Sequence, residues 1–330
     1  MILIVIVMLA VFIYQPEEIE ENTSSHLIGV LSSNDLRLTK LQGLKDGLPL
    51  YGFREGKNIK FLVKNAEGNR EKLLPLAKEL TKAGVEAIVT TGRAETEAAK
   101  EVMRGKDIPV VFMGLTALTQ DQLVKDLLHP QEGLTGVQND HANLSGKRLE
   151  LLTKLLPEIN KVLVVYDPKV VPATESLLAT QDAAEKLKLE LQKEPASTTD
   201  EIRSIFNRSL ADVDAVLLLP SFFLESEGAR ILVPLAMERG VPVMGVEQGA
   251  GTDFFAIYGV TTYDQGKQAA RILAKILNGQ KVVDIPVEPP SELKLTVDLE
   301  VAKRLGLKID PSILGYAELK YSKAGGSNAK

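Results

Sequence analysis

Residues 27–34 read LIGVLSSN, an apolar run that passes directly into three small polar residues. A similar arrangement returns at residues 87–92 (AIVTTG) and 110–114 (VVFMG). Short apolar runs bounded by turn-forming residues are typical of strands that are buried on both faces, as in a parallel sheet. The repetition therefore predicts a parallel sheet whose strands end in small or polar residues.

Amphipathic stretches separate these strands and predict the helices that cover the sheet. Leucines three or four residues apart over residues 41–48 indicate a helix, and residues 59–63 form the next expected strand. Another helix is expected around residues 73–80, with Asn69 as its N-cap and Pro75 disturbing one of its turns. The remaining expected elements of the first half are a helix over 93–105 and a strand over 109–112.

The second half of the chain repeats this order. The expected strands are 162–165, 189–192, 215–219 and 241–246, and the expected helices are 174–187, 199–210 (capped by Thr199 or Asp200) and 225–239. This alternation predicts an α/β protein with two doubly wound parallel-sheet lobes joined by a hinge. Right-handed crossovers bring the carboxyl ends of all strands in a sheet to one edge, where open α/β sheets bind ligands.

The composition narrows the class of protein. Of the 330 residues, 45% are hydrophobic and 25% are charged, which is typical of a folded globular chain. The formal net charge of −5 provides no basic field for nucleic acid, so we expect no nucleic-acid partner. The absence of cysteine excludes disulfides and thiol nucleophiles, and the chain is therefore compatible with an oxidising compartment.

The N-terminus differs from the rest of the chain. Residues 1–14 read MILIVIVMLAVFIY and precede a polar spacer that extends to residue 25. As a helix the apolar run would span about 21 Å, which suits the core of an export signal better than a complete membrane span. We expect an exported, extracytoplasmic protein, with Met1 to Tyr14 either cleaved or retained as an anchor; a buried N-terminal strand is the alternative.

No pattern in the sequence assembles the residues of an enzyme. A dinucleotide-binding G-x-G-x-x-G after a strand, a P-loop and a G-x-S-x-G elbow are all missing. His129 precedes a proline in an expected turn, and His141, near the end of the first lobe, has either a surface or supporting role or a place in the cleft. We therefore expect binding without turnover, with no catalytic residue, cofactor or metal.

Several short motifs, in order along residues 26–318, carry a resemblance to a known family. They are GL (43–44) with GFREGKN (52–58), IPVVF (108–112), GLTGV (133–137), KRLELL (147–152), YG (258–259), DIPVE (284–288) and AKRLGL (302–307). The chain resembles the ABC-transporter substrate-binding proteins of the tryptophan/tyrosine-type group, which have the type I periplasmic-binding fold. The resemblance implies two lobes, connected by three crossing segments, that close on a small molecule and hand it to an ABC permease in the membrane.

The resemblance also implies domain boundaries. The N-terminal lobe would comprise residues 26–140 and about 264–284, and the C-terminal lobe residues 141–263 and about 285–318. Residues 1–25 would precede the lobes, residues 319–330 would form a flexible tail, and the protein would be a monomer.

Carried over residue by residue, the family's ligand-facing loops fall at the strand ends. In the first lobe these are Ser32, Ser33, Asn34, Thr90, Thr91, Gly92, Met113 and Gly114, and in the second lobe Tyr166, Asp167, Pro220, Ser221 and Glu247. Arg93 stands where family members carry a small residue; it either contacts a carboxylate or is solvated. The sequence departs from the family again at Phe222 and at residues 248–249.

These residue types suit an amino acid or a related zwitterion. Hydroxyl groups and helix N-terminal amides can bind a carboxylate, and Asp167 or Glu247 can pair with an ammonium group. Tyr166 or Phe222 can cover an apolar side chain. The alternatives are a membrane-tethered ligand sensor without transport, a transcription regulator, against which no helix-turn-helix precedes His26, and an enzyme on the same architecture.

Overall fold

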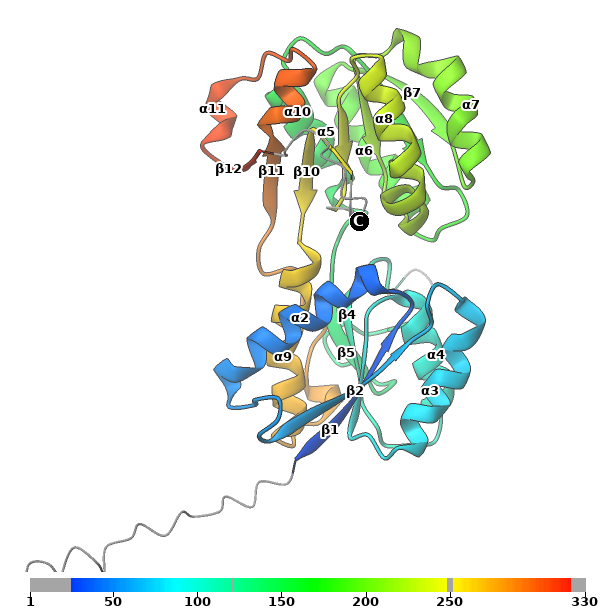
Figure 1. The fold of residues 1–330 in the computed structure, drawn as a ribbon, viewed down its shortest axis with the longest axis vertical. Coiled ribbons are helices and arrows are strands. Elements are labelled where there is room, and N and C mark those ends of the chain that lie inside the picture. Colours follow the sequence, from blue (N-terminus) through cyan, green and yellow to red (C-terminus); the bar gives the residue numbers. More distant parts are fainter. Residues whose placement is uncertain (1–24, 120–121, 248–251, 322–330) are drawn as a thin grey trace, which may run out of the picture.

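The computed structural model describes residues 25–119, 122–247 and 252–321, which fold into two α/β lobes (Figure 1). The predicted export segment, its spacer and nearly all of the predicted tail lie outside these residues. The N-terminal lobe contains a parallel sheet of five strands in the order β2-β1-β3-β4-β5. Its strands are β1 (His26–Ser32), β2 (Ile59–Asn65), β3 (Ala87–Thr90), β4 (Val110–Leu115) and β5 (Leu134–Gln138).

Helices cover both faces of this first sheet because its strands are apolar on both sides. One face packs against α2 (Leu38–Gly47) and α9 (Thr262–Leu277), and the other against α3 (Leu73–Lys82) and α4 (Arg93–Met103). In Figure 1, α9 lies beside α2 although more than 200 residues separate them in the sequence. The two helices approach closely, since a Cβ atom on Gly43 would lie 2.0 Å from the carbonyl oxygen of Tyr263.

The C-terminal lobe contains seven strands in the order β12-β11-β10-β9-β8-β6-β7. They are β6 (Lys161–Tyr166), β7 (Glu190–Pro195), β8 (Ala215–Leu218), β9 (Val243–Gly245), β10 (Ala256–Gly259), β11 (Lys294–Asp298) and β12 (Ala317–Lys320). All pairs are parallel except β10 with β11, which is antiparallel. The predicted fold class of two parallel-sheet lobes is confirmed, except that β11 and β12, which pair in parallel with each other, run opposite to the other five strands of this sheet.

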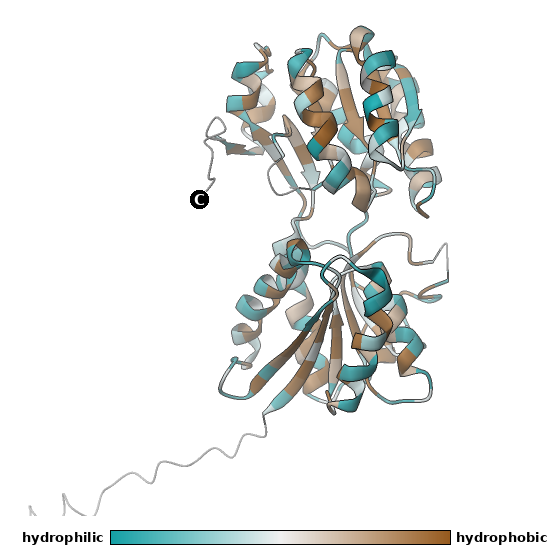
Figure 2. Ribbon diagram, turned by 45° about the vertical axis from the view of Figure 1, so that its right-hand side comes forward, coloured by the Kyte–Doolittle hydropathy of each residue, from teal (hydrophilic) through white to brown (hydrophobic). Residues whose placement is uncertain are grey.

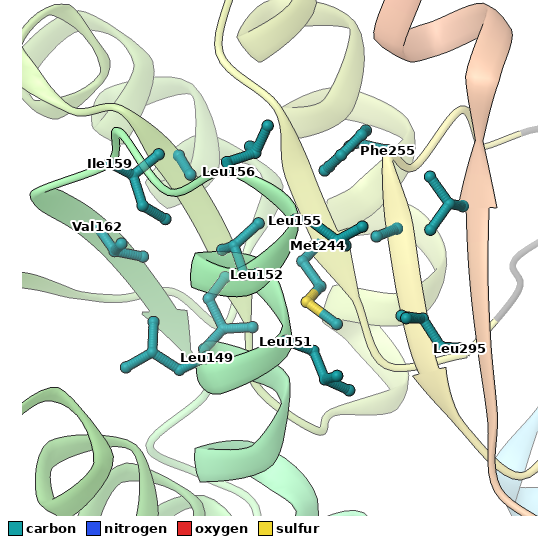
Figure 3. Packing of buried hydrophobic residues seen from close by; sticks show 14 of the residues in the cluster. Leu149, Leu151, Leu152, Leu155, Leu156, Ile159, Val162, Met244, Phe255 and Leu295 are labelled. Atoms are coloured by element: carbon teal, nitrogen blue, oxygen red, sulfur yellow. The ribbon is translucent and has the colours of Figure 1, made fainter. Parts of the chain in front are cut away.

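Two hydrophobic cores lie on the two faces of the second sheet. α5 (Leu144–Leu155), α6 (Ala173–Leu187), α10 (Leu299–Arg304) and α11 (Pro311–Leu314) pack on one face, and α7 (Thr199–Ser209) and α8 (Ala229–Glu238) on the other. Figure 3 shows Leu152 and Leu155 of α5 directed toward Met244 on β9 and its neighbours. Hydropathy follows the same plan, with brown strands inside each lobe and teal helix surfaces outside (Figure 2).

In the described residues the chain crosses between the lobes three times. The crossings are residues 139–143 between β5 and α5, 260–261 between β10 and α9, and 289–293 before β11. Ile285 and Val287, which the expected boundary assigns to the C-terminal lobe, pack in the cores of the N-terminal lobe. The third crossing therefore follows Glu288, whose backbone pairs with Gly136 and Gln138 of β5.

Two local expectations about helices were wrong. Pro75 is the third residue of α3, where backbone N–H groups have no acceptor within the helix, so the proline disturbs no turn. The N-cap of α7 is Thr198 rather than Thr199 or Asp200, and it forms a capping box with Glu201. Asn69 is a cap as expected, although it begins a short 3-10 turn that leads into α3.

Candidate ligand-binding cleft

A cleft of about 840 Å³ opens between the two lobes where the carboxyl ends of their strands face each other. Loop residues and the first turns of helices from both lobes line it. The predicted site residues that line this cleft are Gly92, Arg93, Gly114, Pro220, Ser221 and Glu247. The remaining predicted residues, Ser32, Ser33, Asn34, Thr90, Thr91, Met113, Tyr166 and Asp167, are not part of its lining.

The hydroxyl cluster of the first lobe surrounds a carboxylate that belongs to the protein itself. Glu95, two residues into α4, is fully buried. Its Oε1 atom accepts hydrogen bonds from the backbone N–H of Ser33 and from the hydroxyl of Thr91, both at 2.9 Å. Burial works to raise the pKa of Glu95, but Arg37 and these hydrogen bonds lower it below its ordinary value. The backbone N–H of Ser33 and the hydroxyl of Thr91 are thus engaged with Glu95.

Sequence reasoning missed Glu95 because an acidic residue in the first turn of a helix is common and needs no special role. The buried hydroxyls around it serve the same local network. The hydroxyl oxygens of Ser32 and Thr91 lie 3.2 Å apart, and the hydroxyls of Thr90 and Thr96 share a hydrogen bond of 2.7 Å. These hydroxyl groups therefore hydrogen-bond within the loops at the end of the sheet and do not line the cleft.

Asp167, predicted as a partner for an ammonium group, is also engaged internally. It is buried and accepts hydrogen bonds from the hydroxyls of Ser197 (2.5 Å) and Ser221 (3.1 Å). Its neighbour Tyr166 is partly buried and packs against the core beside α5. Asp167 therefore fixes the position of Ser221, and Ser221 is the residue of the two that lines the cleft.

Arg93 is held by its own lobe. Its guanidinium donates to the carbonyl oxygens of Thr116 and Ala117, and Nη1 lies 4.0 Å from Glu97. Arg93 thus lines the cleft while most of its charge is directed at the segment after β4. Nearby, Gly114 has a φ of 76°, and the side-chain amide of Gln265 occupies the space that a side chain at this glycine would need.

Lys40 of α2 brings a buried positive charge to the N-terminal side of the cleft. The side chain is 5% exposed, and its Nζ atom donates to the carbonyl oxygen of Met113 at 2.7 Å. Burial lowers the pKa of Lys40 to about 8, against the opposing attraction of Glu247. The ammonium is therefore mainly protonated at pH 7, and two of its three N–H bonds are available for other acceptors.

Glu247 supplies the opposite charge from the C-terminal lobe. It follows β9, and its Oε2 atom lies 3.5 Å from Nε2 of His141 in the first crossing segment. Burial works to raise the pKa of Glu247, but the neighbouring imidazole of His141 and the charge of Lys40 lower it below its ordinary value. Glu247 is therefore an ionised carboxylate in the cleft wall.

The tautomer of His141 follows from its other neighbour. Arg148 of α5 is fully buried, and its Nη2 atom lies 3.1 Å from Nδ1 of His141. Because a guanidinium only donates, Nδ1 accepts and the ring proton resides on Nε2, which faces Glu247. Burial and the charge of Arg148 lower the pKa of His141, so the ring is neutral at pH 7.

A second carboxyl group lies beside Glu247. Oε1 of Glu225 accepts a hydrogen bond from the backbone N–H of Ser221 at 3.2 Å. Burial, followed by the negative charge of Glu247, raises the pKa of Glu225 to about 8. At neutral pH Glu225 is thus protonated while Glu247 is ionised, and the two carboxyl groups of this wall carry one negative charge.

The geometry agrees with comparisons to known proteins. Residues 27–320 match the model of the family described as ABC transporter substrate binding protein. The chain belongs to this family. Substrate-binding proteins of this kind are extracytoplasmic, take up a small molecule and are not enzymes as a family, so an ABC permease is the implied partner.

Individual relatives support the same conclusion about the fold. This substrate-binding protein is 26% identical over 280 residues to the tyrosine-binding protein of Clostridioides difficile, covering 84% of this chain and 78% of the relative. An ABC domain from Streptococcus pneumonia, solved in complex with L-Trp, has a TM-score of 0.78 at 23% identity, with 90% of this chain and all of that chain covered. An open substrate-binding protein from Clostridium difficile has a TM-score of 0.74 at 22% identity, with the same coverage.

The described residues place two further limits on this substrate-binding protein. Within them, no three histidine, aspartate or glutamate side chains gather in a way that could hold a metal ion. The helices of the same residues are too short or too polar to cross a membrane.

Proposed function

We propose that this substrate-binding component of an ABC importer captures an amino acid in the cleft between its lobes and binds it without turnover. The observation that carries the proposal is the pairing of opposite charges on opposite lobes. Lys40 of the N-terminal lobe and Glu247 of the C-terminal lobe attract each other across the same cleft. A zwitterion placed between them satisfies both charges at once.

The charges assign an orientation to the ligand. Its ammonium group would pair with Glu247, whose lowered pKa keeps it ionised. Its carboxylate would accept hydrogen bonds from Lys40, which has donors left beyond the one directed at Met113. Because each partner belongs to a different lobe, the ligand contacts both only when the lobes are close together, which is the condition for ligand-driven closure.

The side chain of the ligand would extend toward the mouth of the cleft. Leu36, Val171 and Phe222 line that region and are between 41% and 47% exposed. These apolar groups suit an aromatic or large aliphatic side chain better than a polar one. The amino acids named for the relatives, tyrosine and tryptophan, are therefore the first candidates.

The experiment is isothermal titration calorimetry with a panel of L-amino acids that includes tyrosine and tryptophan. N-acetyl-L-tyrosine, which lacks the ammonium group, and tyramine, which lacks the carboxylate, are the matched controls. We expect at least one apolar amino acid to bind and both controls to bind at least tenfold more weakly, as each loses a hydrogen bond to a charged group. A complete absence of binding heat across the panel would remove the amino-acid assignment.

A matched variant tests the role of Glu247. Glu247→Gln keeps the shape of the side chain and removes its charge, and we expect affinity for the amino acid to fall about 10- to 100-fold. The same change should leave affinity for the N-acetyl derivative nearly unaltered, since that derivative has no ammonium group to lose. Equal losses for both compounds would contradict the assigned orientation.

We further propose that the protein acts as a monomer outside the membrane and that residues 1–14 direct its export or anchor it. Mass measurement of the mature protein distinguishes cleavage from retention. Sedimentation analysis tests the monomer.

A further inference from the structure

A contact between the two lobes is made by the protein's own side chains at the mouth of the cleft. The guanidinium carbon of Arg37 lies 4.5 Å from the centre of the Phe222 ring. Arg37 belongs to the N-terminal lobe, between β1 and α2, and Phe222 belongs to the C-terminal lobe, in the segment between β8 and α8. Both residues line the cleft, so this cation–π contact bridges its two walls.

Arg37 is held in place from behind by Glu95. Its Nη1 atom lies 3.5 Å from Oε2 of Glu95 and donates to the carbonyl oxygen of Thr91 at 3.4 Å. The Glu95 side chain is 1% exposed and the Arg37 side chain is 21% exposed, so the pair is largely shielded from solvent. Glu95 in turn is fixed by Ser33 and Thr91, and the arginine is therefore anchored to the ends of β1 and β3 through a buried carboxylate.

Glycine at position 92 makes room for this arrangement. A Cβ atom at Gly92 would lie 1.3 Å from Nη1 of Arg37. The φ of Gly92 is −170°, an extended conformation open to any residue, so space alone accounts for the glycine. The first lobe is thus shaped around the guanidinium group.

Phe222 presents its ring from the opposite wall. The side chain is 47% exposed, so its ring is free to meet the N-terminal lobe. The hydroxyl of Ser226 donates to the carbonyl oxygen of Phe222 at 2.5 Å and closes the turn that precedes α8. The ring itself lies against the guanidinium group of Arg37.

We propose that the Arg37–Phe222 contact biases the two lobes toward the closed arrangement before any ligand binds, and that Glu95 is the positioning residue that sets Arg37 for it. A contact that exists only when the lobes are close favours the closed state by its own free energy. The ligand then has less of the closing free energy to supply, and its apparent affinity rises with the closed fraction. The inference concerns the protein alone and does not depend on which amino acid it binds.

The test measures the distance between the lobes in the full chain without ligand. The sequence contains no cysteine, so Glu71→Cys and Asp200→Cys introduce two unique labelling sites for a fluorescent donor and acceptor. Both residues are exposed, and each follows a strand end on the cleft side of its own lobe. Single-molecule energy transfer then reports the ratio of closed to open molecules.

We expect Phe222→Leu to reduce the closed-to-open ratio about two- to fivefold, the fold-change that corresponds to an exposed cation–π contact. Phe222→Tyr keeps the aromatic face and should leave the ratio unchanged. Because Phe222 is exposed, neither change should prevent folding, and thermal unfolding checks this. A ratio that is the same in Phe222→Leu and in the unaltered protein would overturn the proposal.

The positioning role of Glu95 requires its own comparison. Glu95→Gln should lower the closed-to-open ratio by a similar factor, and the double variant Glu95→Gln with Phe222→Leu should lower it no further than either single variant. A purely structural role of Glu95 would give effects that multiply in the double variant. Multiplying effects would therefore reject the positioning role while leaving the Arg37–Phe222 contact to be judged from the Phe222 variants.

Discussion

Nε2 of His141 lies 3.5 Å from Oε2 of Glu247, while Nδ1 of the same ring lies 3.1 Å from Nη2 of Arg148. One neutral imidazole thus stands between a buried cation of α5 and the ionised carboxylate of the cleft. Because His141 lies in the first crossing segment, the carboxylate of Glu247 in the cleft wall is in contact with one of the segments that join the lobes.

Replacing this imidazole should weaken ligand binding. His141→Leu removes the N–H group that faces Glu247, so the pKa of Glu247 should rise and the carboxylate should be less well oriented. We expect affinity for L-tyrosine or L-tryptophan, whichever binds, to fall about tenfold, the factor that corresponds to a change of about one unit in the pKa of Glu247. The matched control is His129→Leu, which alters an exposed loop histidine and should leave calorimetric affinity unchanged.

Arg148 should contribute strongly to stability through the crossing segments. Its Nε atom donates to the carbonyl of Tyr258, directly before the second crossing, and Nη1 donates to the carbonyl of His141 in the first. Arg148→Met removes one hydrogen bond from each of these carbonyls and leaves a gap where the buried guanidinium stood, and we expect the free energy of unfolding to fall by about 3 kcal/mol. Urea titration measures this loss, and the exposed neighbour Lys147→Met should change it by no more than about 0.5 kcal/mol.

The close approach of α2 and α9 should not tolerate a methyl group. A Cβ atom on Gly43 would meet the backbone oxygen of Tyr263 at 2.0 Å, and backbone atoms cannot rotate away as a side chain can. Gly43→Ala should therefore separate the two helices and lower the free energy of unfolding by about 1–3 kcal/mol, as overpacking does. Gly315→Ala, where no atom lies within 4 Å of the added carbon, is the control and should be nearly neutral in thermal unfolding.

Glu225 should make stability depend on pH. Its pKa is raised from 4.5 to about 8, so between these values the folded protein holds a proton that the unfolded chain has lost. The free energy of unfolding should therefore decrease as the pH rises from about 4.5 to 8, and Glu225 should cause no further decrease above pH 8. Glu225→Gln should remove this part of the slope, so that the variant gains stability over the unaltered protein as the pH approaches 8. A constant difference between the two proteins across this range would contradict the protonated state of Glu225.

Lys40 affects stability in the adjoining pH range, from about 8 to 10.5, where it makes the free energy of unfolding rise with pH. Its pKa is lowered from 10.5 to about 8, so its burial destabilises the protein fully below pH 8 and less as the pH rises toward 10.5. The two groups can therefore be measured separately in one series of unfolding experiments.

Much of the fold could be predicted from the sequence because its strands are continuous apolar runs. Residues 87–89 and 162–165, for example, are fully buried strand residues, and their pattern differs sharply from the amphipathic helices that follow. Four strands were not predicted: β5, β10 and the two reversed strands β11 and β12. β12 reads AELK, a polar segment without the apolar run that marks a buried strand, and its place depends on contacts far away in the sequence.

The candidate site was harder to predict than the fold. Strand-end positions identify the loops at the edge of a sheet, but not which atoms in a loop face outward. Thr91 and Gly92 are adjacent, yet the hydroxyl of Thr91 donates a hydrogen bond to Glu95, whereas Gly92 lines the cleft. Lys40 and Glu225 lie within helical segments, where charged residues are normally solvated. Only the packing of the lobes reveals that Lys40 is buried and Glu225 half-buried in the cleft walls.

Because α9 interrupts the C-terminal lobe, neither lobe is a continuous piece of the chain. During synthesis from the N-terminus, the face of the first sheet that Ile28 and Val30 occupy has α2 as a cover, but Ile272 and Leu273 of α9 arrive only after most of the second lobe has been made. Until α9 has been synthesised, part of the apolar surface of the N-terminal lobe is therefore exposed to water. During this interval the nascent chain needs to be kept from aggregating through that apolar surface. A gene fragment that ends before α9 would likewise encode an N-terminal lobe in which one face of the sheet is only partly covered.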